Sequence, residues 1–118
     1  MLKMEYINRS AAVIKSKKPF LEWLNALPDS DIQLNLRDIQ QDCTVLLLPE
    51  FDDENQSLLY IKGYFKIILD KELDGFCTDP NYWPQKRDYK TFLRWFDIEI
   101  YSAIIDTVGK EIIKEKYE

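Results

Sequence analysis

Residues 44–76 decide the fold, and they read TVLLLPEFDDENQSLLYIKGYFKIILDKELDGF. The apolar run Thr44–Leu48 predicts a strand. Because no polar side chain interrupts it, we expect that strand to be buried on both faces, as a central strand is. An acidic turn follows, and from Leu58 to Leu73 apolar residues recur at helical spacing. We therefore expect a strand, an acidic turn and a long helix, with the rest of the chain covering this unit.

The ends and the middle of the long helix carry separate signals. Asp52 or Asp53 is expected to cap the first turn, where acidic side chains also oppose the helix dipole. Gly63 costs roughly 1 kcal/mol relative to alanine inside a helix, a cost that would be offset if another backbone packed close to it. Gly75 predicts the end of the helix in a left-handed conformation.

Two shorter elements precede this unit. Residues 11–14 are β-compatible and have polar flanks, which predicts a strand within residues 7–16. Residues 18–27 predict a short amphipathic helix, whose apolar face holds Phe20, Trp23, Leu24 and Leu27. A proline ends that helix, and residues 29–31 predict a polar turn. Residues 32–42 fit either a short strand or a helical turn, and we expect a loop with a helical turn.

Three segments follow the long helix. Residues 76–88 contain two prolines and no hydrophobic period, which predicts a loop of about a dozen residues. Asp88 can cap another short amphipathic helix, whose apolar face holds Tyr89, Phe92, Leu93 and Phe96. Residues 97–108 fit either a half-exposed strand or a helix, and their β-branched side chains favour the strand. Residues 110–118 are a charged tail, either helical or frayed.

These elements predict one domain of 118 residues. The order is β-α-β-α-α-β, which indicates an α+β or α/β two-layer sandwich of about three strands, a long central helix and two short amphipathic helices. If the first two strands are parallel neighbours, the first helix is a right-handed crossover.

Composition excludes several classes of function. The formal net charge is −5, and such an acidic balance opposes binding to nucleic acid. The start of the chain does not have the pattern of a signal peptide, so export is not predicted. No apolar run reaches the length of about 20 residues that would predict membrane insertion. With only two cysteines, Cys43 and Cys77, the expected location is the cytoplasm, with both thiols reduced. The chain contains no histidine, which removes Ser-His-Asp and Cys-His catalysis and the common zinc sites. No recognisable catalytic set remains, so an enzyme is disfavoured and no cofactor is expected.

The acidic turn is one candidate site. Glu50, Asp52, Asp53 and Glu54 lie at the carboxyl end of a strand, where α/β folds often place ligands. Carboxylates suit hard cations such as Mg²⁺, so Glu50, Asp52 and Asp53 are weak metal candidates. Helix capping explains the same residues without a ligand and is the favoured interpretation.

The loop after the long helix is the second candidate. It holds Cys77, Asp79, Tyr82, Trp83 and Arg87, and a rigid aromatic and cationic patch is typical of binding hot spots. The alternative is that Trp83 plugs the end of the core and Arg87 pairs with an acid. Cys77 lacks an adjacent base and is disfavoured as a nucleophile.

The chain also resembles a family of small uncharacterised bacterial proteins. The similar segments are Asn8-Arg9, Pro19–Asn25, Leu27-Pro28, Thr44-Val45, Pro49-Glu50, Asp52-Asp53, Cys77–Asp79, Trp83-Pro84, Arg87, Phe92 and Trp95-Phe96. The resemblance implies a single bacterial domain and no particular activity. Together, these observations predict a non-enzymatic module that binds a protein partner or itself. The alternative is a small metal-assisted hydrolase or ligand-binding protein that uses the acidic turn.

Overall fold

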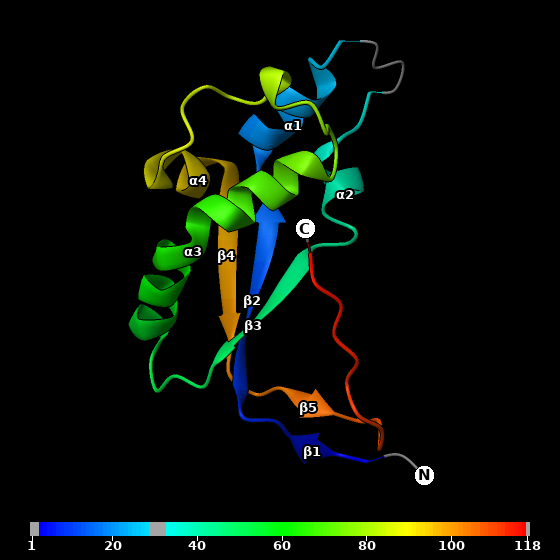
Figure 1. Cartoon of the computed structure of the whole chain (residues 1–118), viewed down its shortest axis with the longest axis vertical. Coiled ribbons are helices and arrows are strands. Elements are labelled where there is room, and N and C mark those ends of the chain that lie inside the picture. The colour runs from blue at the N-terminus through cyan, green and yellow to red at the C-terminus, as the bar shows by residue number, and fades with distance from the viewer. Residues whose placement is uncertain (1–2, 29–32, 118) are drawn as a thin grey trace.

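The centre of the molecule is a three-stranded antiparallel sheet, seen in a computed structural model that describes residues 3–28 and 33–117 (Figure 1). The strand order is β3-β2-β4, formed by β3 (Thr44–Pro49), β2 (Arg9–Ser16) and β4 (Phe96–Tyr101). Ile14 of β2 lies opposite Thr44 of β3 and Ile98 of β4. The α+β class is thereby shown, and the strand expected within residues 97–108 is confirmed at β4.

The expectation of a parallel crossover is wrong, because β2 and β3 are antiparallel neighbours. Helix α1 (Lys18–Asn25) has eight residues and is about 12 Å long. Strand β2 also has eight residues but extends over about 26 Å. The helix therefore covers only about half the length of β2, and the chain enters β3 at the end of the sheet where β2 stops.

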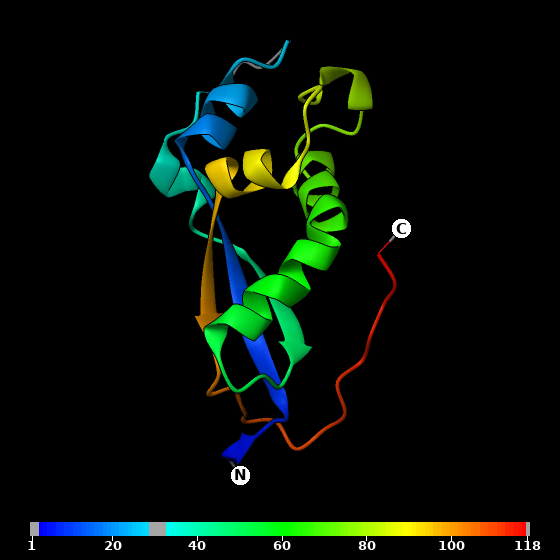
Figure 2. The ribbon, with the colours of Figure 1, turned by 90° about the vertical axis from the view of Figure 1, so that its left-hand side faces the viewer.

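Helix α3 (Glu54–Asp74) covers one face of the sheet, and Figure 2 shows the two layers from the side. Side chains from both layers form the core, and the fully buried ones include Ala12, Phe20, Ile61, Leu69, Leu73 and Phe92. No other backbone packs against Gly63 in the described residues, since a Cβ there would meet no atom within 4 Å apart from its own helix backbone and chain neighbours. Gly75 is also not left-handed: its φ is −63° because the helix ends in a right-handed turn.

Strand β3 is not the central strand that its apolar sequence predicts. It lies at the edge of the sheet, and β2 is central. The residues of β3 alternate between the two faces. Leu48 is buried, whereas Val45 and Leu47 remain 57% and 49% exposed. The helices cover only one face, so the second apolar set of β3 faces outward.

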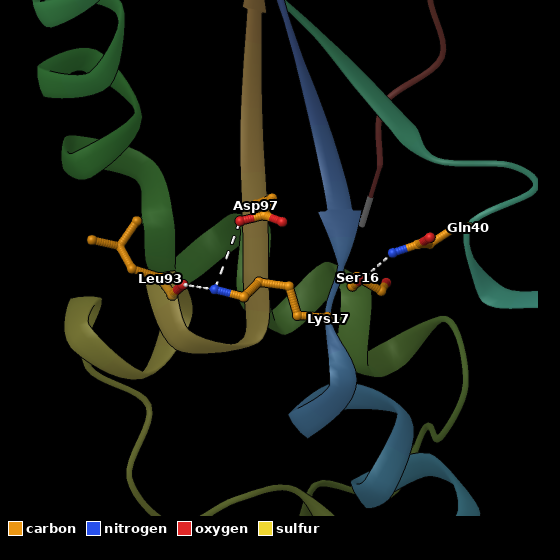
Figure 3. Close-up of polar contacts among 5 residues, drawn as sticks. All are labelled: Ser16, Lys17, Gln40, Leu93 and Asp97. Atoms are coloured by element: carbon orange, nitrogen blue, oxygen red, sulfur yellow. Dashed lines mark hydrogen bonds and ion pairs between the residues drawn. The ribbon is translucent and has the colours of Figure 1, made fainter. Parts of the chain in front are cut away.

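The end of the sheet near α1 is closed by short helices. They are α1, α2 (Leu36–Ile39) and α4 (Tyr89–Trp95). Lys17 joins three elements: its Nζ donates to the carbonyl of Leu93 at 3.2 Å and lies 3.7 Å from Asp97 Oδ1 (Figure 3). Gln40, just after α2, donates to the carbonyl of Ser16 at 2.7 Å. These contacts fix α1 over the end of the sheet.

The remaining parts agree with the sequence in outline. Helix α2 confirms the helical turn expected within residues 32–42, whereas the polar turn expected at residues 29–31 lies outside the described residues. A two-stranded sheet was not expected: β1 (Glu5–Tyr6) pairs with β5 (Ile105–Asp106). The tail, described to residue 117, is neither helix nor strand. Over the described ranges, no helix is long and apolar enough to cross a lipid bilayer.

Candidate functional site

The loop between α3 and α4 is held in shape by two tryptophans. The indole N–H of Trp83 donates to the carbonyl of Cys77 at 2.7 Å, which closes the loop on itself. The indole N–H of Trp23, on α1, donates to the carbonyl of Tyr82 at 2.8 Å. Between them lies a 3₁₀ turn, η1 (Pro80–Tyr82), which Asp79 caps by accepting from the backbone N–H of Asn81 at 3.0 Å. The loop is therefore tied both internally and to α1.

Arg87 fastens the other side of the loop to α3. Its guanidinium carbon lies 5.5 Å from the centre of the Trp83 ring, and its Nη1 donates to the carbonyl of Pro84 at 2.9 Å. Its Nε lies 3.4 Å from Asp70 Oδ1, and both atoms are buried. An ion pair at this separation compensates the two charges, although neither atom has a hydrogen-bond partner in the described part of the chain. Trp83 is half-buried, so Trp83 and Arg87 both act in holding the loop.

A cleft of about 450 Å³ lies between this loop and the end of α1. Two of the four residues expected to bind, Asp79 and Tyr82, line it. Trp83 and Arg87 do not line it and instead support its wall. Cys77, which belongs to the same candidate loop, also lines the cleft, and the side chains that sequence reasoning missed as site residues are Leu24, Leu27, Phe76 and Thr78. Pro28 completes the lining.

Phe76 shows why the cleft has an apolar wall. It packs edge-on against the buried ring of Phe20, with the ring centres 5.5 Å apart, yet remains 47% exposed. Tyr82 is 48% exposed on the other side. In the sequence, the phenylalanine directly after the helix-ending glycine is the signal that could have marked this wall.

The acidic turn is a separate feature at the opposite end of α3 (Figure 1). Asp52, Asp53 and Glu54 line a hollow of about 170 Å³, together with the buried hydroxyls of Ser10 and Ser57. Glu50 is not part of this lining. The two candidate regions therefore do not share a pocket.

The carboxylate of Asp53 caps α3, as the sequence predicted. Its Oδ1 accepts from the backbone N–H of Gln56 at 2.9 Å, and Gln56 Oε1 in return accepts from the backbone N–H of Asp52 at 3.1 Å. Within residues 3–28 and 33–117, no three acidic or cysteine side chains are grouped so as to hold a metal ion. The side chains of Asp53 and Gln56 thus bind the backbone at the helix terminus.

No protein-family model matches the chain, and no curated protein and no solved structure matches it either. The resemblance to a bacterial family therefore stays a prediction.

The two cysteines are free thiols. Burial raises the pKa of Cys43, and the nearby charge of Lys15 only partly opposes that shift. Cys77 lines the cleft, and its thiol donates to the carbonyl of Asp79 at 3.6 Å. That contact gives the Cys77 thiol a structural role within the loop.

Proposed function

We propose that this chain is a non-enzymatic protein-interaction module whose binding site is the cleft between α1 and the loop of residues 76–83. The observation that carries the proposal is the pair of half-exposed rings, Phe76 and Tyr82, beside a cleft whose wall is fixed by two indole hydrogen bonds. Binding hot spots favour such aromatic side chains in a rigid setting.

The lining indicates what a partner should present. Leu24, Leu27 and Phe76 offer apolar contact, so an aliphatic or aromatic side chain suits the interior. Asp79 uses its Oδ1 on the backbone N–H of Asn81 and contributes the negative charge at the site. A basic residue beside the apolar one would complement that charge. The proposed ligand is a peptide segment with an apolar anchor next to Lys or Arg, met in the bacterial cytoplasm.

A peptide array tests this proposal. The array carries apolar anchors with a basic, neutral or acidic neighbour and is probed with the full chain. We expect retention of the apolar-basic peptides, loss of retention in Tyr82→Ala, and loss of the preference for basic neighbours in Asp79→Asn. Tyr101→Ala is the matched control, because Tyr101 is 51% exposed on β4 and does not line the cleft.

Two results would contradict the proposal. One is equal binding of acidic and basic peptides by the natural chain. The other is a peptide profile that Tyr82→Ala and Tyr101→Ala change to the same extent. Circular dichroism of each variant establishes that the comparison is made between folded proteins.

A further inference from the structure

Strand β3 has the sequence of a central strand and the position of an edge strand. Its six residues, TVLLLP, carry no charge. Natural edge strands are commonly protected by charged side chains or by prolines, and here the proline stands only at the last position. The opposite edge differs, because β4 carries Asp97 and Glu99. Of the two edges of the sheet, β3 is therefore the one built for pairing.

The edge of β3 is bordered by an apolar groove against α3. The groove measures about 210 Å³, and its lining includes Leu46, Leu47, Tyr60, Tyr64 and Ile67. On the α3 side of this edge, Tyr64 is 49% and Ile67 64% exposed, and on the uncovered face of the sheet Leu47 is 49% exposed. Exposed side chains of this kind, gathered along a strand edge, are typical of an interaction surface.

We propose that two copies of this chain associate by antiparallel pairing of their β3 strands. The pair forms one six-stranded sheet about a two-fold axis perpendicular to it, with both α3 helices on the same face. Each β3 then becomes an interior strand, as its composition predicts. The exposed Tyr64 and Ile67 of both copies border the junction. This surface shares no lining residue with the cleft of the proposed function, so the two proposals are independent.

Charge supports this pairing and opposes the alternative edge. Lys71 Nζ donates to Thr44 Oγ1 at 3.0 Å at one end of β3, and Glu50 follows the other end. A two-fold axis through Leu47 places Thr44 opposite Glu50 of the second copy. The ammonium group of Lys71, beside Thr44, then lies near the Glu50 carboxylate of the second copy at both ends of the strand pair. Lys71 also lies 3.6 Å from Glu72, so its charge is shared. Pairing through β4 would instead bring the acids of two copies together, which is unfavourable.

The C-terminal segment passes this edge without joining it (Figure 1). Ile112 and Lys114 share a hollow of about 180 Å³ with Leu47, and Tyr117 donates to Asp74 Oδ2 at 3.3 Å, at the far end of α3. Ile113 is 89% exposed. The segment is thus held by exposed contacts that a second β3 strand can displace. It is also the alternative surface through which two copies of the chain can associate.

Sedimentation of the full chain over a concentration series tests the proposal. The mass is expected to rise from 14.1 kDa towards twice that value. Leu47→Lys and Ile67→Lys should each keep it at the monomer value, because the two introduced ammonium groups repel each other near the axis. Tyr101→Lys on the other edge and Leu59→Lys on α3 are matched controls of similar exposure, and both should dimerise. Thermal melting establishes that all four variants fold.

Three outcomes would overturn the proposal. A natural chain that stays monomeric at the highest concentration shows that the edge does not pair. A dimer that survives both Leu47→Lys and Ile67→Lys uses another surface. A dimer that is lost in Ile113→Lys but kept in Leu47→Lys assigns the association to the C-terminal segment.

Discussion

At both ends of helix α3, side chains form hydrogen bonds with the backbone, but these bonds have different effects at the two ends. At the N-terminal end, Asp53 Oδ1 and Gln56 Oε1 accept hydrogen bonds from backbone N–H groups, so these two side chains stabilise the helix terminus. At the C-terminal end, Trp23 and Trp83 use their indole N–H groups to fix the loop, and this leaves Asp79 and Tyr82 beside an open cleft. Trp83, the largest side chain of the loop, is therefore a support, whereas its neighbours Asp79 and Tyr82 form the wall of the cleft.

The largest effect is expected from Trp83→Ala. This change removes the hydrogen bond to the Cys77 carbonyl, the contact with Arg87 and the packing of a half-buried ring against the core. We expect a loss of about 3 kcal/mol in the free energy of unfolding, the lower end for truncating a large aromatic side chain. Urea denaturation measures it.

Trp83→Phe separates the two contributions of this side chain. It keeps most of the packing and loses the donor, so about 1 kcal/mol should be lost. If Trp83→Ala unfolded at the same urea concentration as the natural chain, the tryptophan would not support the loop. The comparison between the two ends would then fail.

Sequence reasoning found the parts of both ends but not their assembly. The spacing of Phe20, Trp23 and Leu24 predicted α1 because helical periodicity is local, and the carboxylate of Asp53 predicted the cap for the same reason. The cleft depends on Trp23 meeting Tyr82, which lies 59 positions further along the chain. No local pattern encodes that contact.

The same limit explains the errors about the sheet. The apolar run of β3 indicated burial correctly on one face, but whether a strand is central depends on which strands pair with it. The direction of β3 depends on the end of the sheet at which the chain enters it again, and a local pattern of apolar residues does not express this. Whether another backbone packs against Gly63 likewise depends on the neighbours of α3, which the local sequence does not express.

The second prediction concerns the acidic end. Asp53→Ala removes the acceptor for the backbone N–H of Gln56, which should lower the free energy of unfolding by about 1 kcal/mol. Asp52→Ala is the matched control: Asp52 takes part through its backbone N–H, and we expect a change within about 0.5 kcal/mol. Both values come from chemical denaturation at neutral pH.

Melting the chain with added Mg²⁺ tests whether the acidic end of α3 binds a metal ion. A ligand that binds the folded chain must raise its melting temperature. If Mg²⁺ raised the melting temperature of the natural chain and Asp53→Ala abolished the rise, the acidic end would be a binding site. The contrast between the two ends of α3 would then disappear.

The smallest effect is expected from Asp88, which caps α4 at the end of the loop between α3 and α4. Its Oδ1 accepts from the backbone N–H of Thr91 at 2.8 Å, and Lys86 Nζ lies 3.7 Å from its Oδ2. Hydrogen bonds from the side chain and backbone of Thr91 lower the pKa of Asp88 below its ordinary value of 3.8. The carboxylate of Asp88 thus caps α4, beyond the C-terminal end of α3, just as the carboxylate of Asp53 caps the N-terminal end of α3.

A lowered pKa in the folded state means that the charged cap stabilises the fold above pH 3.8 and that this stabilisation is lost as pH falls through the folded pKa. Asp88→Asn keeps a capping oxygen but does not titrate. The melting temperature of the natural chain should therefore exceed that of Asp88→Asn by a constant amount from neutral pH down to about pH 5, and the difference should shrink below pH 4. A difference that grew as the pH fell would mean that the carboxylate is stabilised in its protonated form. Asp88 would then have a role that Asp53 lacks, and the carboxylates on the two sides of α3 would no longer be equivalent.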